Sequence, residues 1–254
     1  MSFPLWRGVA VALVTLFDAR REVDAAATAA HAATLVDIGV RAVVVGGSTG
    51  ESEALTDAEL ADLVAAVRAA CPAVPVLAGA SGPWVRPAAA RAATVVKAGA
   101  DAVLVAPPRR ATDLAAFYGD VAQAVAPAAV LAYHYPGTAG GEVPVGALPD
   151  LPVHGLKDST GDAERLLAEL AAWQRPTYVG SSALVAYAGQ LGAAGAILAA
   201  ANVAPEDCVP AFGGDAAAQH RLLGPHLAIR GRFPHGLKAA VAQRFGTPVH
   251  ARLG

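Results

Sequence analysis

The sequence predicts an α/β protein built as a (β/α)8 TIM barrel with additional C-terminal helices. Three observations lead to this prediction: a length of 254 residues, short apolar runs that alternate with Ala-rich stretches of helical length, and a helix exit that recurs along the chain. Barrels of this kind commonly have about 250 residues in one domain. We therefore expect a single domain, with the barrel over residues 1–204 and a helical extension of it over residues 205–254.

The recurring feature is a helix that ends in a glycine and passes into a buried strand. It occurs at Gly39, Gly99 and Gly192, and each glycine is followed by a short run of apolar residues. Glycine readily takes the left-handed conformation that ends a helix. A short apolar run after such a signal is typical of a buried strand.

Five further apolar runs bring the number of expected strands to eight: residues 9–16, 74–78, 129–133, 153–157 and 177–180. The Ala-rich stretches expected to be helices are residues 24–38, 56–70, 87–98, 112–125 and 162–173. Strands that alternate with helices favour a parallel sheet, and at this length a closed barrel is the favoured form. An open doubly wound sheet is the alternative, but no Gly-x-Gly-x-x-Gly motif follows the first strand.

Composition and charge narrow the classes of function. The chain has 19 basic and 21 acidic residues, a net charge of −2 and no clustered Lys/Arg run, so neither nucleic acid nor a membrane surface is an expected partner. The apolar run over residues 9–16 is too short to span a bilayer. The two cysteines, Cys71 and Cys208, lie far apart, which argues against a disulfide-stapled secreted fold. We therefore expect a cytoplasmic protein that acts on a small molecule.

Lys157 is the first candidate catalytic residue. Active sites of such barrels lie at the carboxyl ends of the strands, and of the three lysines, Lys97, Lys157 and Lys238, only Lys157 closes a predicted strand. Desolvation there lowers the pKa of the ammonium and frees a neutral amine to attack a carbonyl carbon. The alternatives are that Lys157 pairs with an acidic residue or is solvated.

Two further segments follow the ends of predicted strands. Tyr133 closes the strand before that of Lys157, so its phenol is expected to reach a substrate bound at the lysine. The turn Gly46-Gly-Ser-Thr-Gly-Glu follows the second strand and exposes backbone N–H groups and two hydroxyls. Such a turn binds a carboxylate or phosphate well. The alternative is an ordinary loop in which Ser or Thr caps the next helix.

Three motifs stand in order at these strand ends: Gly47-Ser-Thr-Gly-Glu, Tyr133-x-x-Pro136 and Gly155-Leu-Lys-Asp-Ser-Thr-Gly. With them, the chain resembles the dihydrodipicolinate synthase / N-acetylneuraminate lyase family from about Val9 to Asn202. The resemblance implies a (β/α)8 barrel with C-terminal helices, assembly into a homo-oligomer (dimer or tetramer), and a Schiff base between a lysine and pyruvate or another 2-keto acid. It implies no metal and no organic cofactor, and the histidines show no metal-ligand spacing.

The same resemblance implies roles for individual residues. Lys157 would form the Schiff base, and Tyr133 would carry a proton to and from the substrate. Gly47, Ser48 and Thr49 match the turn that binds the keto-acid carboxylate, one hydroxyl also touching the tyrosine, and Thr49 is counted with the catalytic residues. The expected substrate-binding residues are Gly47, Ser48, Arg109, Thr138 and Ser181.

Two departures from the family pattern bear on the substrate. Where the family has a second tyrosine after the fourth strand, this chain has Pro108 or Arg109, and where the biosynthetic synthases carry an arginine it has Thr138. Arg109 is expected to contact the distal part of an anionic or polyhydroxylated substrate; the alternative is a solvated pair with Arg110. The Tyr-His-Tyr-Pro segment from Tyr133 looks like that of the 2-keto-3-deoxy sugar acid aldolases.

The leading hypothesis is a class I lyase that cleaves or joins pyruvate and an aldehyde. The alternatives are a dihydrodipicolinate synthase that condenses pyruvate with aspartate semialdehyde, and a catalytically impaired homologue that binds a keto acid. Nearby polar residues receive lesser roles: His134 as a supporting group, Glu51 as a hydrogen-bond partner within its own loop, and Asp158 as either an orienting group for Lys157 or a solvated carboxylate.

Overall fold

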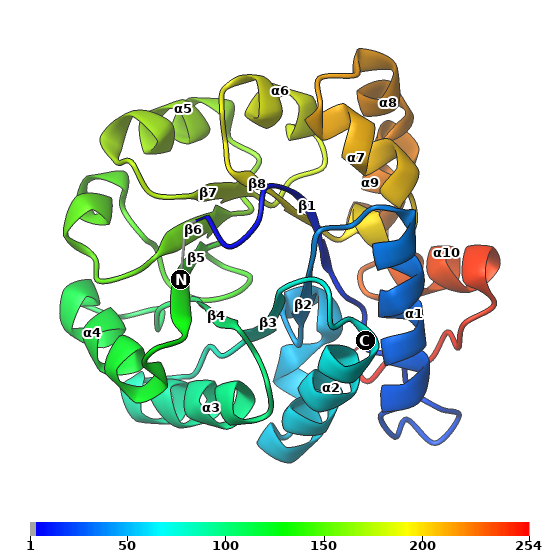
Figure 1. The fold of residues 1–254 in the computed structure, drawn as a ribbon, viewed down its shortest axis with the longest axis horizontal. Helices are drawn as coiled ribbons and strands as arrows, with labels where there is room; N and C mark the ends of the chain where they lie inside the picture. Colours follow the sequence, from blue (N-terminus) through cyan, green and yellow to red (C-terminus); the bar gives the residue numbers. More distant parts are fainter. Residues whose placement is uncertain (1–3, 254) are drawn as a thin grey trace.

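The computed structural model describes residues 4–253, so the outermost residues of the predicted domain, 1–3 and 254, lie outside the description. Within this range, eight parallel strands close into a barrel in chain order, which confirms the predicted (β/α)8 fold (Figure 1). The strands are β1 (Gly8–Ala12), β2 (Ala42–Val45), β3 (Val76–Gly79), β4 (Ala102–Val105), β5 (Ala129–His134), β6 (Gly155–Asp158), β7 (Thr177–Val179) and β8 (Gly195–Leu198).

Helices surround the barrel and continue beyond it. Those between strands are α1 (Ala25–Ile38), α2 (Asp57–Ala70), α3 (Val85–Lys97), α4 (Leu114–Val125), α5 (Ala163–Ala172) and α6 (Val185–Gln190). After β8 the chain forms α7 (Pro205–Phe212), α8 (Ala216–Arg221), α9 (Leu223–Gly231) and α10 (His235–Phe245), which lie on one side of the barrel (Figure 1). None of the helices described here is long and apolar enough to cross a membrane.

Local sequence signals account for the helix boundaries. Thr56 forms a capping box with Glu59 at the start of α2, and Asp24 and Asp162 accept hydrogen bonds from the first turns of α1 and α5. The three glycines predicted to end helices have positive φ angles: 126° at Gly39, 111° at Gly99 and 83° at Gly192. Both kinds of signal act within one helical turn, so they are readable from the sequence.

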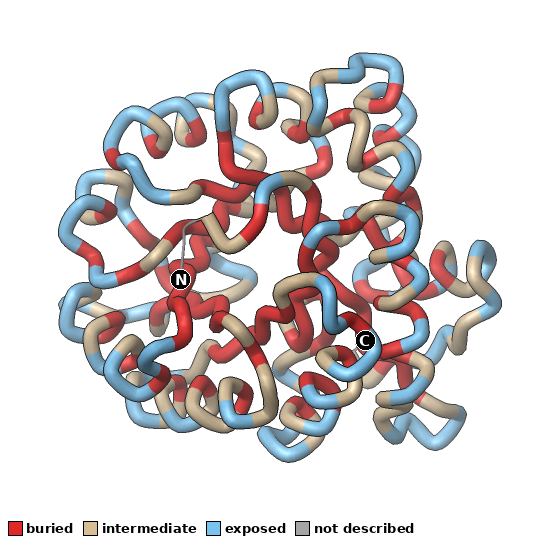
Figure 2. The backbone as a smooth tube through the Cα atoms, in the orientation of Figure 1, coloured by how far each residue is buried: buried red, intermediate tan, exposed pale blue. Residues whose placement is uncertain are grey.

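The core has two layers, because side chains of a strand point alternately into the barrel and toward the helices. The inner layer includes Ala10, Leu77 and Leu104. Trp6 stacks on Tyr178 at 4.1 Å between ring centroids and belongs to this inner layer. The larger outer layer packs the strands against the helices, so the buried residues follow the strands and the inward faces of the helices (Figure 2).

Several strand boundaries differ from the prediction, such as β3 (predicted 74–78) and β6 (predicted 153–157), and the largest difference is at β1. The run over residues 9–16 was expected to be one strand, but β1 ends at Ala12 although the next residues stay buried. The N–H groups of Val14 and Leu16 donate to the side chains of Asn202 and Thr28, at 3.1 and 3.0 Å, instead of to a neighbouring strand. An apolar run predicts burial, but it does not say which acceptor satisfies the backbone.

Candidate active site

Lys157 and Tyr133 face each other across two neighbouring strands. The parallel register of β5 and β6 pairs Tyr133 with Lys157, so both side chains point to the same face, into the barrel. The Nζ atom of Lys157 lies 4.5 Å from the centroid of the Tyr133 ring. The two residues that sequence analysis singled out as amine and phenol are therefore brought together at the carboxyl end of the barrel.

Burial makes the Lys157 amine a good nucleophile. The side chain is 6% exposed, and desolvation lowers its pKa from 10.5 to about 7. A substantial fraction of the amine is then neutral near neutral pH. Asp158 does not pair with it, because the Asp158 carboxylate accepts hydrogen bonds from Thr160 (2.8 Å to the backbone N) and from Arg165 (2.6 Å).

The Tyr133 phenol lies where three loops meet. Burial raises its pKa, while hydrogen bonds with the Ser159 and Ser48 side chains lower it. Ser159 follows β6 and Ser48 follows β2. A neutral phenol held between two hydroxyls can donate a proton and take one back, which is what proton transfer at a substrate requires.

The turn after β2 is held from two sides. Residues Ser48–Gly50 form a short 3-10 helix, η1. The hydroxyl of Thr15 donates to the Gly50 carbonyl at 2.7 Å. On the other side, the strand end at Gly79 packs so closely that a Cβ there would lie 2.2 Å from the Gly46 carbonyl oxygen. The N–H groups of the first residues of a helical turn have no acceptor within the turn, so those of Ser48 and Thr49 suit a carboxylate.

A pocket of about 980 Å³ opens at this end of the barrel. It is formed by the loops after β2, β3, β4 and β5, and its lining includes Gly47, Ser48, Arg109, Tyr133 and Thr138. Lys157 is not among the lining residues, but the Tyr133 ring that its Nζ faces is. The pocket therefore reaches the Tyr133 ring, against which the amine lies.

Not every predicted substrate-binding residue lines the pocket. Thr49 is buried, with 9% exposure, and Ser181 lies half-buried after β7, where its hydroxyl accepts a long hydrogen bond of 3.4 Å from the Ala183 N–H. Neither residue is part of the pocket lining. Their proposed contacts with substrate stay predictions.

Arg109 and Thr138 come together on adjoining loops. The Arg109 guanidinium donates from Nη2 to the Gly137 carbonyl at 3.0 Å, one residue before Thr138. The Gly141 N–H donates to the Pro107 carbonyl at 2.7 Å, which adds a second link between the loops after β4 and β5. Arg109 is thus exposed and lines the pocket, but it is also tied to a neighbouring loop, unlike the freely solvated arginine of the alternative interpretation.

Sequence analysis missed several residues of the site. Ser159 stands two residues after Lys157, so strand alternation assigns it to the same face, and this signal was available. Ser81 accepts a hydrogen bond from the Ala106 N–H at 2.8 Å, and Trp84, which is 50% exposed, lines the pocket with it. Arg91 reaches the pocket from α3, which only the tertiary structure reveals.

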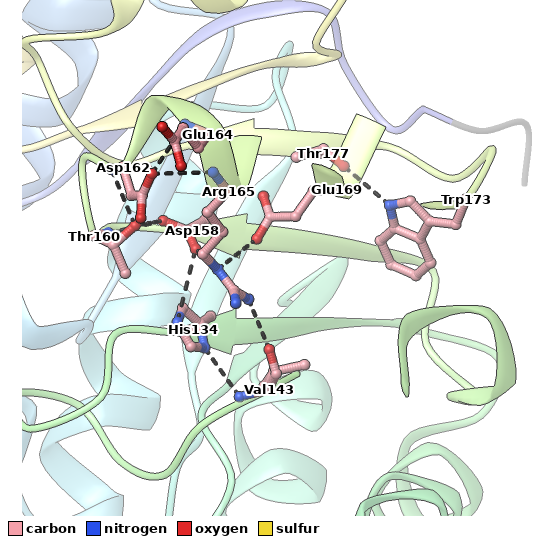
Figure 3. A network of polar contacts seen from close by, with 10 residues as sticks. All are labelled: His134, Val143, Asp158, Thr160, Asp162, Glu164, Arg165, Glu169, Trp173 and Thr177. Atoms are coloured by element: carbon pink, nitrogen blue, oxygen red, sulfur yellow. Dashed lines mark hydrogen bonds and ion pairs between the residues drawn. The ribbon is translucent and has the colours of Figure 1, made fainter. Parts of the chain in front are cut away.

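A network of polar side chains links the ends of β5 and β6 to α5 (Figure 3). Arg165 donates to Asp158 at 2.6 Å and to the Val143 carbonyl at 2.7 Å, and His134 accepts from the Val143 N–H at 2.9 Å. His134 is thus a supporting group, as expected. The network joins β5 and β6 to α5 just outside the paired positions of Tyr133 and Lys157.

Glu169 is the unusual member of this network. It is fully buried, and burial first and the charge of Asp158 second raise its pKa from 4.5 to about 8. Arg165 Nε lies 2.9 Å from a Glu169 oxygen, yet neither Glu169 oxygen has a well-directed hydrogen bond. The Nε–H group of Arg165 points at Asp158 rather than at Glu169. Glu169 is therefore a neutral carboxylic acid near neutral pH.

No group of three or more His, Cys, Asp or Glu side chains within residues 4–253 is arranged to hold a metal ion.

The sequence matches a known family and several individual proteins. The profile of the Dihydrodipicolinate synthetase family matches residues 5–217. The chain is 37% identical to a DapA-like lyase of Halobacterium salinarum, covering 78% of this chain and 68% of that one. It is 34% identical to a mitochondrial protein of Emericella nidulans named probable 4-hydroxy-2-oxoglutarate aldolase (81% and 72% covered), and 33% identical to a 4-hydroxy-tetrahydrodipicolinate synthase of Salinibacter ruber (79% and 70% covered).

Solved structures agree with this result. The crystal structure of a dihydrodipicolinate synthase from Aquifex aeolicus superimposes with a TM-score of 0.87 at 26% identity, covering 98% of this chain and 91% of that one. A dihydrodipicolinate synthase from Bacillus anthracis gives a TM-score of 0.87 at 25% identity, with the same coverage of 98% and 91%.

Proposed function

Because the chain belongs to the dihydrodipicolinate synthetase family, we propose that it is a class I lyase that holds pyruvate as a Schiff base on Lys157 and joins it to, or releases it from, an aldehyde. The observation that carries the proposal is the buried Lys157 amine, with its pKa lowered to about 7, facing Tyr133 at 4.5 Å. A barrel with an ordinary protonated lysine at this position would not favour attack on a carbonyl.

The first half of the reaction follows from these groups. The neutral amine attacks C2 of the 2-keto acid and forms a carbinolamine, while the N–H groups and hydroxyls of the Ser48–Thr49 turn hold the carboxylate. The Tyr133 phenol donates a proton to the carbinolamine hydroxyl, which leaves as water as the C=N bond forms. The phenolate is stabilised by its hydrogen bonds with Ser48 and Ser159 until it takes a proton back.

The protonated imine then serves as an electron sink. In the condensing direction, C3 loses a proton and the resulting enamine adds to the carbonyl carbon of the aldehyde. In the cleaving direction, the C4 hydroxyl gives up its proton and becomes the aldehyde carbonyl as the C3–C4 bond breaks, and the electrons of that bond move to the imine nitrogen and form an enamine. A proton added to C3 converts the enamine back into the protonated imine, and water hydrolyses this imine, which releases pyruvate and restores the amine.

Thr138 favours an aldehyde derived from a sugar acid or another small aldehyde over aspartate semialdehyde. It lines the pocket at the position where the biosynthetic synthases carry an arginine for the second carboxylate. A carboxylate without a charged partner there forfeits a strong hydrogen bond. Because some relatives are named as synthases, a synthase that uses aspartate semialdehyde is the second candidate function. Because the second tyrosine is absent, a homologue that only binds a keto acid is the third. We further propose that the enzyme works in the cytoplasm as a homo-oligomer.

The first test is a covalent trap. Incubation with pyruvate and borohydride is expected to add the reduced pyruvyl mass to the peptide that contains Lys157. Lys157→Arg, which keeps the charge without a nucleophile, is expected to abolish the adduct, and the matched Lys97→Arg variant is expected to keep it. An adduct on Lys97 or Lys238, or none in the folded enzyme, would refute the assignment.

The second test separates the three candidates. Pyruvate release or consumption is measured across a panel of 2-keto-3-deoxy sugar acids and aldehydes that includes aspartate semialdehyde. Turnover of a sugar acid supports the lyase, turnover confined to aspartate semialdehyde supports the synthase, and a Lys157 adduct without any turnover supports the binding homologue.

A further inference from the structure

Glu51 follows the carboxylate-binding turn directly and is held in an uncommon state. Its side chain is completely buried, and its backbone has a φ of 56°, in the left-handed region that residues with a Cβ rarely adopt. Such a conformation persists where surrounding contacts determine it. The contacts were expected within its own loop, but the structure places them elsewhere.

The partners of Glu51 come from the C-terminal end of the chain. The backbone N–H groups of Arg252 and Leu253 donate to Oε2 of Glu51, at 2.8 and 2.7 Å, across a sequence separation of 201 residues and more. The Nζ atom of Lys238, on α10, forms an ion pair with Oε1. Lys238 is fully buried too and donates to the His250 carbonyl at 2.7 Å.

The same C-terminal segment is anchored beside the turn by the Arg252 side chain. Its guanidinium makes two hydrogen bonds to the Glu59 carboxylate, at 2.6 and 3.0 Å, and one to the Ala54 carbonyl at 2.7 Å. Glu59 lies in the first turn of α2 and Ala54 ends the loop that leads to it. Residues 252–253 accordingly lie beside the start of α2 and the loop that leads to it, near the label of α2 in Figure 1.

We propose that Glu51, Lys238 and the backbone of residues 252–253 form a clamp that fixes the Ser48–Thr49 turn, so that the C-terminal segment sets the affinity of the site for the carboxylate of the 2-keto acid. The inference rests on the proposed function, because it deepens the role of that turn. The Thr15 hydroxyl donates to the Gly50 carbonyl. The side chain of the next residue, Glu51, accepts hydrogen bonds from the C-terminal segment. Glu51 and Lys238 are positioning residues that touch no substrate.

Single substitutions would confuse this role with the effect of an unpaired buried charge. The test therefore compares two double variants that both lack the charge pair. Glu51→Gln/Lys238→Met keeps a carbonyl oxygen for the two backbone N–H groups, whereas Glu51→Ala/Lys238→Met removes it. The alanine variant lacks the hydrogen bonds between the turn and the C-terminal segment, and it also leaves a cavity, whose cost in stability the thermal midpoint reports.

The measurement is the pyruvate concentration that half-saturates borohydride trapping of Lys157, with the thermal midpoint recorded in parallel. The Ala/Met variant is expected to need about tenfold more pyruvate, because small misplacements of binding groups cost up to about 10²-fold. The Gln/Met variant is expected to stay near wild type. Glu206→Gln, which breaks the ion pair between Glu206 and Arg244, is the control and should leave half-saturation unchanged.

A purely structural role would lower the thermal midpoint of the Ala/Met variant without moving half-saturation in the folded protein, and that result overturns the proposal. If this variant does not fold, Arg252→Ala replaces it, and unchanged half-saturation there is equally decisive. If the wild type forms no adduct, the proposed function fails by itself. Hydrogen exchange of residues 46–52 then decides: faster exchange in the Ala/Met than in the Gln/Met variant supports the clamp, and equal exchange overturns it.

Discussion

Lys157 and Tyr133 depend on each other at the scale of single residues, because each shapes the environment of the other. The aromatic ring helps to exclude water from the amine, and desolvation lowers the lysine pKa while it raises that of the phenol. The directions are opposite because burial disfavours the charged form of either group, cation or anion. A neutral amine beside a neutral phenol is the pair that imine formation requires.

The pKa of Lys157 predicts how activity falls at low pH. Protonation removes the nucleophile, so kcat/KM for pyruvate is expected to rise with pH and to level off above a pKa near 7. Below that pKa it should fall about tenfold for each pH unit, as for one titrating group. A steady-state pH profile measures this decline. Activity that stays level as the pH falls through 7 would contradict the lowered pKa.

Tyr133→Phe tests the proton-transfer role of the phenol. The substitution keeps the ring over Lys157 and removes only the hydroxyl, so turnover is expected to fall about 10²–10⁴-fold while the fold is retained. Tyr178→Phe is the matched control, because Tyr178 also lies inside the barrel but its hydroxyl donates to the Trp6 carbonyl, at 3.3 Å. Near-normal turnover of Tyr133→Phe would show that Tyr133 only packs in the site and transfers no proton.

At the scale of elements, the barrel divides the work between strands and loops. The strands β5 and β6 fix the amine and phenol by register, which is rigid because both strands are hydrogen-bonded on both sides. The loops after β3, β4 and β5 form the pocket wall and carry the polar side chains that a second substrate would meet. Under the proposed function, the strand ends would carry the groups that form the Schiff base, and the loops would carry the groups that select the second substrate.

Arg109→Ala tests the wall formed by the loops after β4 and β5. Loss of the guanidinium removes both a donor to the substrate and the bond to the Gly137 carbonyl. KM for the aldehyde or sugar acid is expected to rise about tenfold with little change in kcat, since a hydrogen bond from a charged group contributes about 1.5–3 kcal/mol.

The exposed Arg221 on α8 provides the control for this experiment, because it pairs with Asp207 at 2.7 Å. Arg221→Ala should leave both constants unchanged. If Arg109→Ala leaves KM and kcat at wild-type values for both pyruvate and the aldehyde or sugar acid, Arg109 is a surface residue that does not contact the substrate.

At the scale of the whole molecule, Glu169 makes stability depend on pH. The folded protein keeps its proton up to about pH 8, whereas the carboxyl of the unfolded chain loses it near 4.5. The folded state therefore binds more protons between these values, so the free energy of unfolding falls as the pH rises through this window. Below 4.5 the contribution is fully present.

Glu169→Gln mimics the neutral acid at every pH. We expect its thermal midpoint to decline less than that of the wild type between pH 4.5 and 8. Glu164→Gln, at an exposed position of the same helix α5, is expected to leave the slope unchanged. The measurement is the thermal midpoint as a function of pH, and parallel curves for wild type and Glu169→Gln would contradict the raised pKa.

The sequence by itself determined the barrel and the position of the chemistry. Strand and helix periodicity, capping residues such as Thr56 and glycine exits such as Gly39 all act over one or two turns, so they can be read locally. Lys157 and Tyr133 were found in the same way, because a strand end in a barrel has a known location. These predictions required no knowledge of which distant segments touch.

Only the tertiary structure decided the contacts between distant parts of the chain. Lys238 closes no predicted strand and received no role from the sequence, yet it is fully buried against Glu51, and Arg252 reaches the first turn of α2. The residues near Glu51 and near Lys238 in the sequence give no signal of their ion pair. A buried ion pair depends on which side chains the closed barrel brings within a few ångströms of each other. Local conformational preferences determine where the helices and strands form, whereas the packing of the complete chain determines which distant residues come into contact.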